Sequence, residues 1–382
     1  MPVQPFPFVD ISGPPRERGR QYGQQAAARI AVSEDIYVDA MGKRGFAWAE
    51  VKQLARDFAP AIAACDPAFL EEMEGIAEGS GIDLETVIVV NARSEIFNGR
   101  SPAAAEALPA EGCTSAVALP AATRDGQLLH GQNWDFNANC VNSAIVLKVT
   151  PEDGPQILTF VEAGGLARSG INSAGISVTA NNLECDRDAG RQGVPLSLIR
   201  RRILSAPTFA QAIGAVTSAE RAVSNNMTVA TAAGDAVNLE TVPDEVFPLW
   251  PDADGLFVHS NHFKSPAAKA KLIDRGILGR SPCTLYRDRR VDAMLRPHLG
   301  NLTAAHFQRA FRDDFGAPYA VCRPPVEARH GYRVSSVATV VFEPAAGALH
   351  ACPAPYENTD FTEYRLDAAA PAVDLAAAVN RA

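Results

Sequence analysis

The hydrophobic pattern of this 382-residue sequence changes from mainly helical to mainly strand-like close to Cys113. From residue 13 to about residue 97, apolar side chains recur three and four positions apart, which is the period of amphipathic helices. After Cys113, apolar residues alternate with polar ones or form short runs between turn residues, which is typical of strands. The Ala- and Pro-rich residues 101–110 separate the two regions and are predicted to form a linker. A chain with separate groups of helices and strands is expected to be an α+β protein with antiparallel sheets.

The individual elements follow from the same periodicities. Helices are predicted at residues 17–30, 48–65, 67–78, 84–97, 195–204, 208–216, 284–295, 303–311 and 373–379. Strands are predicted at residues 114–120, 127–134, 144–149, 156–161, 176–180, 227–232, 236–241, 256–259, 335–342 and 348–351. Residues 79–81, with the sequence GSG, are expected to end the third helix. The result is two groups of strands interrupted by a pair of helices, with a helical leader before them.

Composition and charge restrict the classes of function. Hydrophobic residues make up 47% of the sequence and charged residues 21%, as in a globular protein with an ample core. The net charge of −9 argues against a nucleic-acid-binding surface. The single basic run, residues 200–202, lies in a predicted helix and is expected to form a solvated face. No apolar run approaches the roughly 18 residues of a membrane span, so no membrane partner is expected.

Cysteine usage and the N-terminal residues indicate the cellular compartment. Seven cysteines are scattered without a C-x-x-C pair, which predicts reduced thiols and a cytoplasmic protein. The N-terminus has no charged segment followed by an apolar one, so no signal peptide is expected. His259 and His262 have the spacing of metal ligands, but no further cluster completes a site, so we expect structural roles and no metal. Neither a P-loop nor a dinucleotide fingerprint occurs, and we expect no cofactor.

Cys113 stands at the boundary between the linker and the first strand, where a reactive side chain is unusual. The two strands that follow are predicted to form a hairpin. A turn centred near Arg124 sets Asp135 opposite Cys113, whereas a two-residue turn at residues 125–126 sets Ala138 there. With either turn, Asp135 is within a few residues of Cys113 on the neighbouring strand, where cross-strand Cβ atoms are about 4.5 to 8 Å apart. A thiol and a carboxylate at one end of a hairpin form a candidate site.

The residue before Cys113 indicates what its thiol does. A free thiol has a pKa of about 8.5 and an α-amine one of about 7.7, so a terminal amine is a usable base for its own thiol. Cys113 gains such an amine only when its bond to Gly112 is broken. The thiol can attack the Gly112 carbonyl to give a thioester that water opens, and a glycine does not crowd this attack. Cleavage between Gly112 and Cys113 is therefore predicted. The alternative is a buried structural cysteine, the usual fate of a free thiol.

Several ordered motifs resemble the isopenicillin N acyltransferase family, the acyl-CoA:6-aminopenicillanic-acid acyltransferase type of N-terminal-nucleophile hydrolase. They are GRQYG at residues 19–23, GCTS at 112–115, GQNWDF at 131–136, GINSAG at 170–175, GVP at 193–195, VHSNH at 258–262 and VCR at 321–323. The resemblance implies a four-layer αββα sandwich with a helical N-terminal leader. It also implies cleavage into a mainly helical segment, residues 1–112, and a catalytic segment, residues 113–382, which stay packed as one domain.

The resemblance also implies roles for four residues. Cys113 is the nucleophile and, through its amine, the base, and Asp135 orients it. The side-chain amide of Asn261 donates to the oxyanion, and Arg323 supports the charge arrangement near the nucleophile. These roles are physically sensible, because loss of one oxyanion donor typically raises a barrier by about 2.7–4 kcal/mol.

These inferences predict an enzyme that hydrolyses the amide bond of an N-acylated amine or amino acid through an acyl-enzyme on Cys113. The alternative is an acyl-CoA-dependent N-acyltransferase with the same nucleophile, and a more remote one is a non-catalytic binding protein on this scaffold. The expected partners are a small N-acyl substrate, or acyl-CoA, and the cleaved N-terminal fragment; a homo-oligomer is left open. Ser173, which lies in an incomplete G-x-S-x-G pattern, and the other cysteines are not predicted to compete as nucleophiles.

Overall fold

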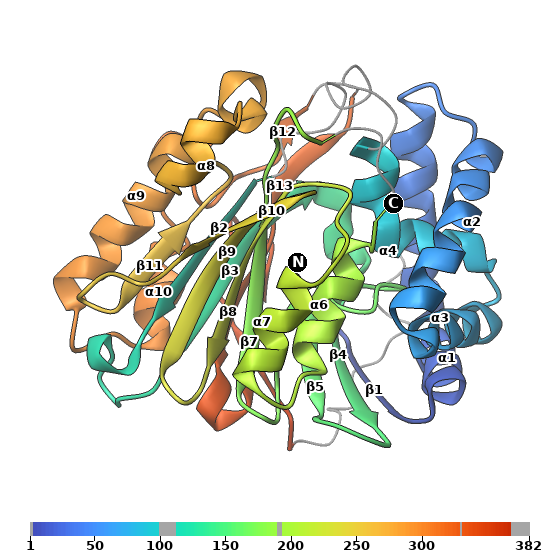
Figure 1. The fold of residues 1–382 in the computed structure, drawn as a ribbon, viewed down its shortest axis with the longest axis horizontal. Helices are drawn as coiled ribbons and strands as arrows, with labels where there is room; N and C mark the ends of the chain where they lie inside the picture. Colours follow the sequence, from blue (N-terminus) through green and yellow to red (C-terminus); the bar gives the residue numbers. More distant parts are fainter. Residues whose placement is uncertain (1–2, 99–111, 189–192, 329–330, 368–382) are drawn as a thin grey trace.

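Two stacked β-sheets form the centre of the molecule, and helices cover their outer faces (Figure 1). The computed structural model describes residues 3–98, 112–188, 193–328 and 331–367. The first sheet has eight strands, in the order β1 (Phe8–Gly13), β4 (Ala144–Pro151), β5 (Ile157–Glu162), β6 (Ser169–Asn172), β7 (Ile176–Asn182), β8 (Asn225–Thr231), β9 (Asp235–Val242) and β10 (Glu245–Leu249). The second has seven, in the order β11 (Leu256–His259), β2 (Gly112–Ala118), β3 (Leu129–Asn137), β13 (Arg333–Glu343), β14 (Ala348–Pro353) and β15 (Thr362–Arg365), with β12 (Val326–Glu327) paired to β13. Strands β1 and β4 pair in parallel, and the other paired strands are antiparallel.

The helices form the two outer layers. They are α1 (Pro15–Gly42), α2 (Trp48–Cys65), α3 (Pro67–Ser80), α4 (Leu84–Asn98), α6 (Leu196–Leu204), α7 (Phe209–Thr217), α8 (Pro266–Lys271), α9 (Thr284–Leu295) and α10 (Ala304–Ala310). Helices α1–α4, α6 and α7 share an apolar core with the first sheet, and α9 and α10 share one with the second (Figure 1). The predicted α+β fold with a four-layer αββα arrangement is confirmed.

The layer between the two sheets is aromatic. Trp134, Phe136, Phe160 and Phe342 are buried in it. Trp134 of β3 packs edge-on against Phe160 of β5, with ring centres 5.6 Å apart, so the contact joins the two sheets. Cys113 belongs to the same buried layer. The predicted nucleophile therefore lies inside the sandwich rather than on its surface.

Helices α1 and α3 pack closely because glycines line their contact. Cβ atoms added at Gly19 and Gly23 of α1 would overlap the backbone of α3, and Cβ atoms added at Gly75 and Gly79 of α3 would overlap the backbone of α1. Each glycine thus admits the main chain of the partner helix. Gly79 is a packing residue inside α3, and the helix ends instead at Gly81, whose φ of 78° is left-handed. The prediction that residues 79–81 end this helix is correct only for its last residue.

Other predicted boundaries differ from the structure. The first helix continues twelve residues beyond its predicted end at residue 30, to Gly42, because Ile36, Tyr37 and Met41 extend its buried face. Strands β1, β6, β10, β12 and β15 and helix α8 have no counterpart among the predicted elements, since each has only two to six residues. The predicted linker at residues 101–110 and the predicted helix at 373–379 lie outside the described residues.

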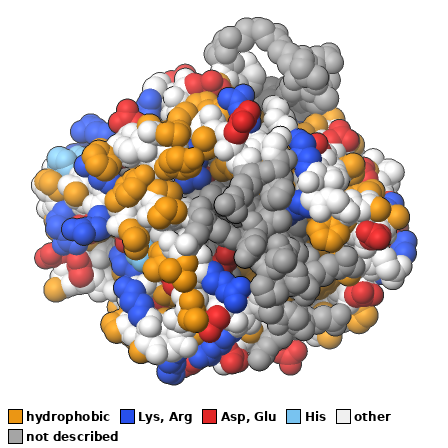
Figure 2. Space-filling model, turned by 90° about the horizontal axis from the view of Figure 1, so that it is seen from above, with side chains coloured by type: hydrophobic (Ala, Val, Ile, Leu, Met, Phe, Trp, Pro, Cys, Tyr) orange, Lys and Arg blue, Asp and Glu red, His pale blue; other side chains and the backbone are white. Residues whose placement is uncertain are grey.

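On the face shown in Figure 2, lysine and arginine side chains are interspersed with acidic and apolar ones rather than gathered into a stripe. Across the described ranges, none of the helices combines the length and the apolar composition of a membrane-spanning helix.

Candidate active site

Strands β2 and β3 form the hairpin that carries Cys113. Gly112 pairs with Asp135, and Cys113 pairs with Trp134. Both predicted registers are wrong, the nearer one by a single residue, because the connecting loop contains a 3-10 turn at Pro120–Ala122. Directly paired residues share a face of a sheet, so Cys113 points with Trp134 into the aromatic layer, whereas Asp135 lies on the opposite face. The thiol and the carboxylate are neighbours, as predicted, but on different sides of the sheet.

Asp135 is fully buried beside Gly112. A Cβ at Gly112 would overlap the Asp135 carboxylate, so a larger residue does not fit there without movement. Oδ1 of Asp135 accepts a hydrogen bond of 2.5 Å from the Ser336 hydroxyl, and Oδ2 lies 3.9 Å from Nε of Arg323. Burial raises the pKa of Asp135, and the positive charges of Arg323 and Arg287 oppose this rise. A carboxyl group with a raised pKa therefore lies against the peptide that precedes the thiol.

Asn261 contacts the backbone of Cys113. Its Oδ1 accepts a hydrogen bond of 2.8 Å from the Cys113 N–H, and its Nδ2 donates one of 2.9 Å to the Asn182 carbonyl. The donors around Oδ1, from Cys113 and Arg287, fix which end of the amide carries the oxygen. The chain is continuous through Gly112 and Cys113, so Asn261 holds the nitrogen that cleavage would turn into the α-amine.

Arg287 is a site residue that the sequence motifs do not indicate. Its Nη1 donates to the Cys113 carbonyl at 2.8 Å and to the Thr114 hydroxyl at 2.9 Å, and its Nη2 donates to Oδ1 of Asn261 at 2.7 Å. The guanidinium thus joins β2 to the loop that carries Asn261. A signal was present in the sequence, because Arg287 lies four and eight residues before Val291 and Leu295 and so falls on the buried face of α9.

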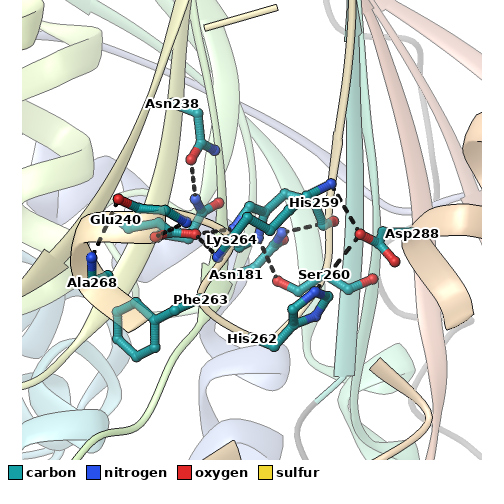
Figure 3. A network of polar contacts seen from close by, with 12 residues as sticks. Asn181, Asn238, Glu240, His259, Ser260, His262, Phe263, Lys264, Ala268 and Asp288 are labelled. Carbon is teal, nitrogen blue, oxygen red and sulfur yellow. Dashed lines mark hydrogen bonds and ion pairs between the residues drawn. The ribbon is translucent and has the colours of Figure 1, made fainter. Parts of the chain in front are cut away.

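The loop after β11 that carries Asn261 is held by a buried polar network (Figure 3). Nε2 of His259 lies 2.8 Å from Oε1 of Glu240, a buried side chain of β9. The same Glu240 oxygen accepts a hydrogen bond from the backbone N–H of Lys264. The Lys264 ammonium in turn forms an ion pair of 3.0 Å with Asp288 of α9. Both sheets and a covering helix therefore position Asn261.

His262 lies in the same loop and completes its attachment to α9. Its Nδ1 lies 2.9 Å from the Thr284 hydroxyl, which also accepts the backbone N–H of Asn261 at 2.7 Å. Burial lowers the pKa of His262 to about 4, so it is neutral at physiological pH. No group of three or more potential metal-ligating side chains occurs in the part of the chain that the structure describes. His259 and His262 thus link this loop to β9 and α9.

Arg323 lies between Asp135 and a second buried thiol. Its Nη2 donates to Sγ of Cys283 at 3.4 Å, and its backbone N–H donates to the Ser336 hydroxyl at 2.8 Å. Burial raises the pKa of the Cys283 thiol. The positive charges of Arg287 and Arg323 outweigh this effect, so the pKa of Cys283 is lowered. Cys283 is therefore a buried thiol beside two arginines, a setting that the sequence did not predict.

The predicted solvated face at residues 200–202 is wrong for two of its three arginines. Arg200 is 8% exposed and Arg201 is 2% exposed, while Arg202 is partly exposed. Helix α6 is enclosed because it packs between α4 and the first sheet. Arg201 forms an ion pair of 2.9 Å with Glu72, a fully buried residue of α3. Arg200, in contrast, lines a small cavity together with Arg93 and Arg168.

Comparison with known proteins identifies the family. The sequence matches the family described as acyl-coenzyme A:6-aminopenicillanic acid acyl-transferase over residues 122–354. The 40 kDa form of acyl-coenzyme A:6-aminopenicillanic-acid-acyltransferase from Emericella nidulans is 27% identical over 339 residues, which is 88% of this chain and 89% of that protein.

Two solved structures show a weaker likeness. A mutant form of conjugated bile acid hydrolase from Clostridium perfringens is 14% identical, with a TM-score of 0.44 over 66% of this chain and 92% of that one. Penicillin V acylase from Agrobacterium tumefaciens is 11% identical, with a TM-score of 0.41 over 66% of this chain and 86% of that one. The family match, in contrast, spans more than half of the sequence. This chain belongs to the acyl-coenzyme A:6-aminopenicillanic acid acyl-transferase family.

Proposed function

We propose that this protein is a self-processing cysteine amidohydrolase, which cuts itself between Gly112 and Cys113 and then hydrolyses N-acyl amides through an acyl-enzyme on Cys113. The observation that carries the proposal is that both sides of this peptide bond are held. Asp135 lies against Gly112, and Asn261 and Arg287 bind the N–H and the carbonyl of Cys113. A thiol, a buried carboxyl group and a fixed peptide together are the parts that self-cleavage needs.

In the first reaction, the Cys113 thiol attacks the Gly112 carbonyl carbon. A C–S bond forms, the C–N bond between the two residues breaks, and the proton of the thiol passes to the departing nitrogen. Water then hydrolyses the thioester, which leaves a carboxylate on Gly112 and restores the thiol. Asp135, whose pKa is raised by burial, is placed to carry a proton beside Gly112.

In the second reaction, the new α-amine of Cys113 acts as the base for its own thiol, since an α-amine has a pKa near neutrality. Oδ1 of Asn261 accepts a hydrogen bond from this nitrogen before the cut, and we expect it to hold the amine afterwards. Nδ2 of Asn261 has two hydrogens and gives one to the Asn182 carbonyl, which leaves the other for the oxyanion of the substrate. Arg323 supports the charge of Asp135, and water releases the acyl group.

An acyl-CoA-dependent N-acyltransferase is the second candidate, and the names of the family and of the Emericella nidulans relative favour it. Both activities use the same thioester and differ in whether water or an amine resolves it. Product formation from an N-acyl amide in water alone, compared with formation from acyl-CoA plus an amine, separates them. A binding protein would be neither cut nor acylated.

The cut is tested on a denaturing gel and by N-terminal sequencing. Two fragments of 112 and 270 residues are expected, in proportion about 12 and 29 kDa of the 40.6 kDa chain, the larger beginning at Cys113. Cys113→Ala should remain a single chain. Cys352→Ala, which removes another buried thiol, on β14, should be cut like the unmodified protein. A single uncut band for active unmodified protein would contradict the proposal.

A further inference from the structure

Three arginines gather at the end of the aromatic layer where Cys113 lies. Arg93 comes from α4, Arg168 from the loop between β5 and β6, and Arg200 from α6. We call these three side chains the arginine cluster. Together with Glu162 they line a cavity of about 20 Å³. A cavity of this size has room for a small polar group and not for an acyl chain.

Two members of the arginine cluster share one carboxylate. Oε2 of Glu162 lies 2.5 Å from Nη1 of Arg93 and 3.0 Å from Nη2 of Arg168. The guanidinium of Arg168 also lies over the Trp134 ring, with 3.9 Å between its central carbon and the ring centre. Trp134 pairs with Cys113 on the neighbouring strand. Arg93 and Arg168 therefore lie against the aromatic side chain of the residue that pairs with Cys113.

Arg200 has no such partner in the part of the chain that the structure describes. It is 8% exposed, it makes no hydrogen bond or ion pair to another described residue, and its Nε is buried without a hydrogen-bond partner. Burial, together with repulsion from Arg168 and Arg93, lowers the pKa of Arg200 to about 9, so it is still a cation at neutral pH. Cys113 lies close enough that its thiolate acts on the same pKa. A buried cation without an ion pair among the described residues is unfavourable, which favours binding of an anion there.

Glu95 is the other acid within electrostatic range of Arg200. Its Oε1 accepts a hydrogen bond of 2.9 Å from the N–H of Leu196, and its Oε2 has no hydrogen-bond partner among the described residues. Burial raises the pKa of Glu95 to about 7, so it is only partly ionised at neutral pH. Glu162 and a partly ionised Glu95 do not balance three guanidinium groups, and the cavity keeps a positive charge.

We propose that Arg200 binds a carboxylate of the substrate, with Arg93 and Arg168 beside it. This rests on the proposed function, because the amide carbonyl must then lie at Cys113 while the carboxylate enters the cavity. A guanidinium suits the role, since its planar N–H groups match the two oxygens of a carboxylate. The substrate class is an N-acyl amide that carries a carboxylate, on either its amine half or its acyl half, rather than a neutral amide.

Three substrates with matched chains test this assignment. Hexanoylglycine carries the carboxylate on its amine half, the mono-propylamide of adipic acid carries it on its acyl half, and N-propylhexanamide carries none. We would measure kcat and KM for each with the cut protein, with Arg200→Gln and with Arg202→Gln. Arg202 lies two residues further along α6 and does not line the cavity, so its variant removes the same charge elsewhere.

The unmodified protein should prefer one of the carboxylates over N-propylhexanamide by about 10- to 100-fold in kcat/KM, the range expected for hydrogen bonds to a charged group. Arg200→Gln should remove most of this preference, mainly through KM, because the contact is remote from the reacting atoms. Arg202→Gln should keep it. Which carboxylate is preferred identifies the half of the substrate that enters the cavity.

A thermal melt separates recognition from a structural role. Arg200→Gln removes a cation without a described partner, so its melting temperature should equal or exceed that of the unmodified protein, whereas loss of a structural cation would lower it. A cut protein that hydrolyses all three substrates equally, or an Arg200→Gln variant that keeps the preference, would overturn the carboxylate assignment while leaving the proposed function intact. An uncut chain that is acylated by none of them would overturn both.

Discussion

Arg287 makes three hydrogen bonds, to the Cys113 carbonyl, the Thr114 hydroxyl and Oδ1 of Asn261. Arg287→Lys keeps the positive charge, but a single ammonium on a flexible stem does not reproduce the fork of a guanidinium. We expect self-cleavage to slow by about 10- to 100-fold, which corresponds to the loss of one or two charge-assisted hydrogen bonds. The half-time of cutting in refolded precursor, followed on a gel, measures this.

Arg289→Lys is the matched control for Arg287→Lys, because Arg289 is exposed on the same helix. It should be cut at the unmodified rate. Equal half-times for the two variants would show that Arg287 does not position the scissile peptide.

The fold brings together the site residues that sequence motifs indicate. Residues whose chemistry depends on their three-dimensional neighbours could not be predicted from the sequence. Asp135, Asn261 and Arg323 all lie around the peptide at Cys113, although their roles remain predictions. The lowered pKa of Cys283 was missed because one of the two arginines that cause it, Arg323, comes from a distant part of the chain. The contact of Arg323 with this thiol has no local sequence pattern, since tertiary packing sets it.

Helix α3 lies against α1 through glycines whose replacement would push the two main chains apart. Gly75→Ala places a methyl group onto the carbonyl of Arg16, and we expect it to lower the free energy of unfolding by about 1–3 kcal/mol.

Gly214→Ala is the opposite case, because Gly214 lies within α7 with open space around its Cα. That change should raise the free energy of unfolding by about 0.5–1 kcal/mol through helix propensity alone.

Urea unfolding of both glycine variants in the Cys113→Ala background measures the difference on a single chain. If Gly75→Ala were as stable as Gly214→Ala, the close approach of α1 and α3 would be wrong.

Long elements with strong periodicity were predictable, and short ones that depend on neighbours were not. The helix at residues 48–65 matches α2 residue for residue, because its apolar positions repeat over several turns. Strand β1 has six residues and exists because it pairs in parallel with β4, about 140 positions away in the chain. The buried face of α6 was missed for the same reason. From the sequence alone, Arg200 and Arg201 are expected to be solvated, but in the structure α4 and the first sheet enclose them.

The two sheets are also joined by a buried polar contact that gives the molecule a pH dependence. His130 of β3 lies 2.9 Å from the hydroxyls of both Ser177 and Thr179 on β7. Burial lowers the pKa of His130 to about 3, below the value of about 6.5 that applies in the unfolded chain. The unfolded state therefore binds a proton more readily, and stability is lost as the pH falls from 6.5 toward 3.

Between pH 7 and pH 5, His130 should account for a loss of about 2 kcal/mol in the free energy of unfolding. His130→Gln keeps hydrogen-bonding groups but does not titrate. Between pH 7 and pH 5, the free energy of unfolding of this variant should fall by about 2 kcal/mol less than that of the unmodified protein. His298→Gln, at a partly exposed histidine, is the control. Urea unfolding at the two pH values in the Cys113→Ala background decides the matter, and a His130→Gln protein with unchanged pH sensitivity would contradict the assignment.

The fold takes contacts from both sides of the proposed cut. Strand β1 completes the first sheet beside β4, and Asn91 of α4 donates to the Gly164 carbonyl and accepts from the N–H of Leu166. Before the cut, refolding is a first-order process whose yield is independent of protein concentration. After it, the same contacts join two separate molecules, so refolding becomes second order and its yield falls on dilution. If the chain is cut as proposed, folding therefore comes first and cutting second, and the cut makes that order irreversible.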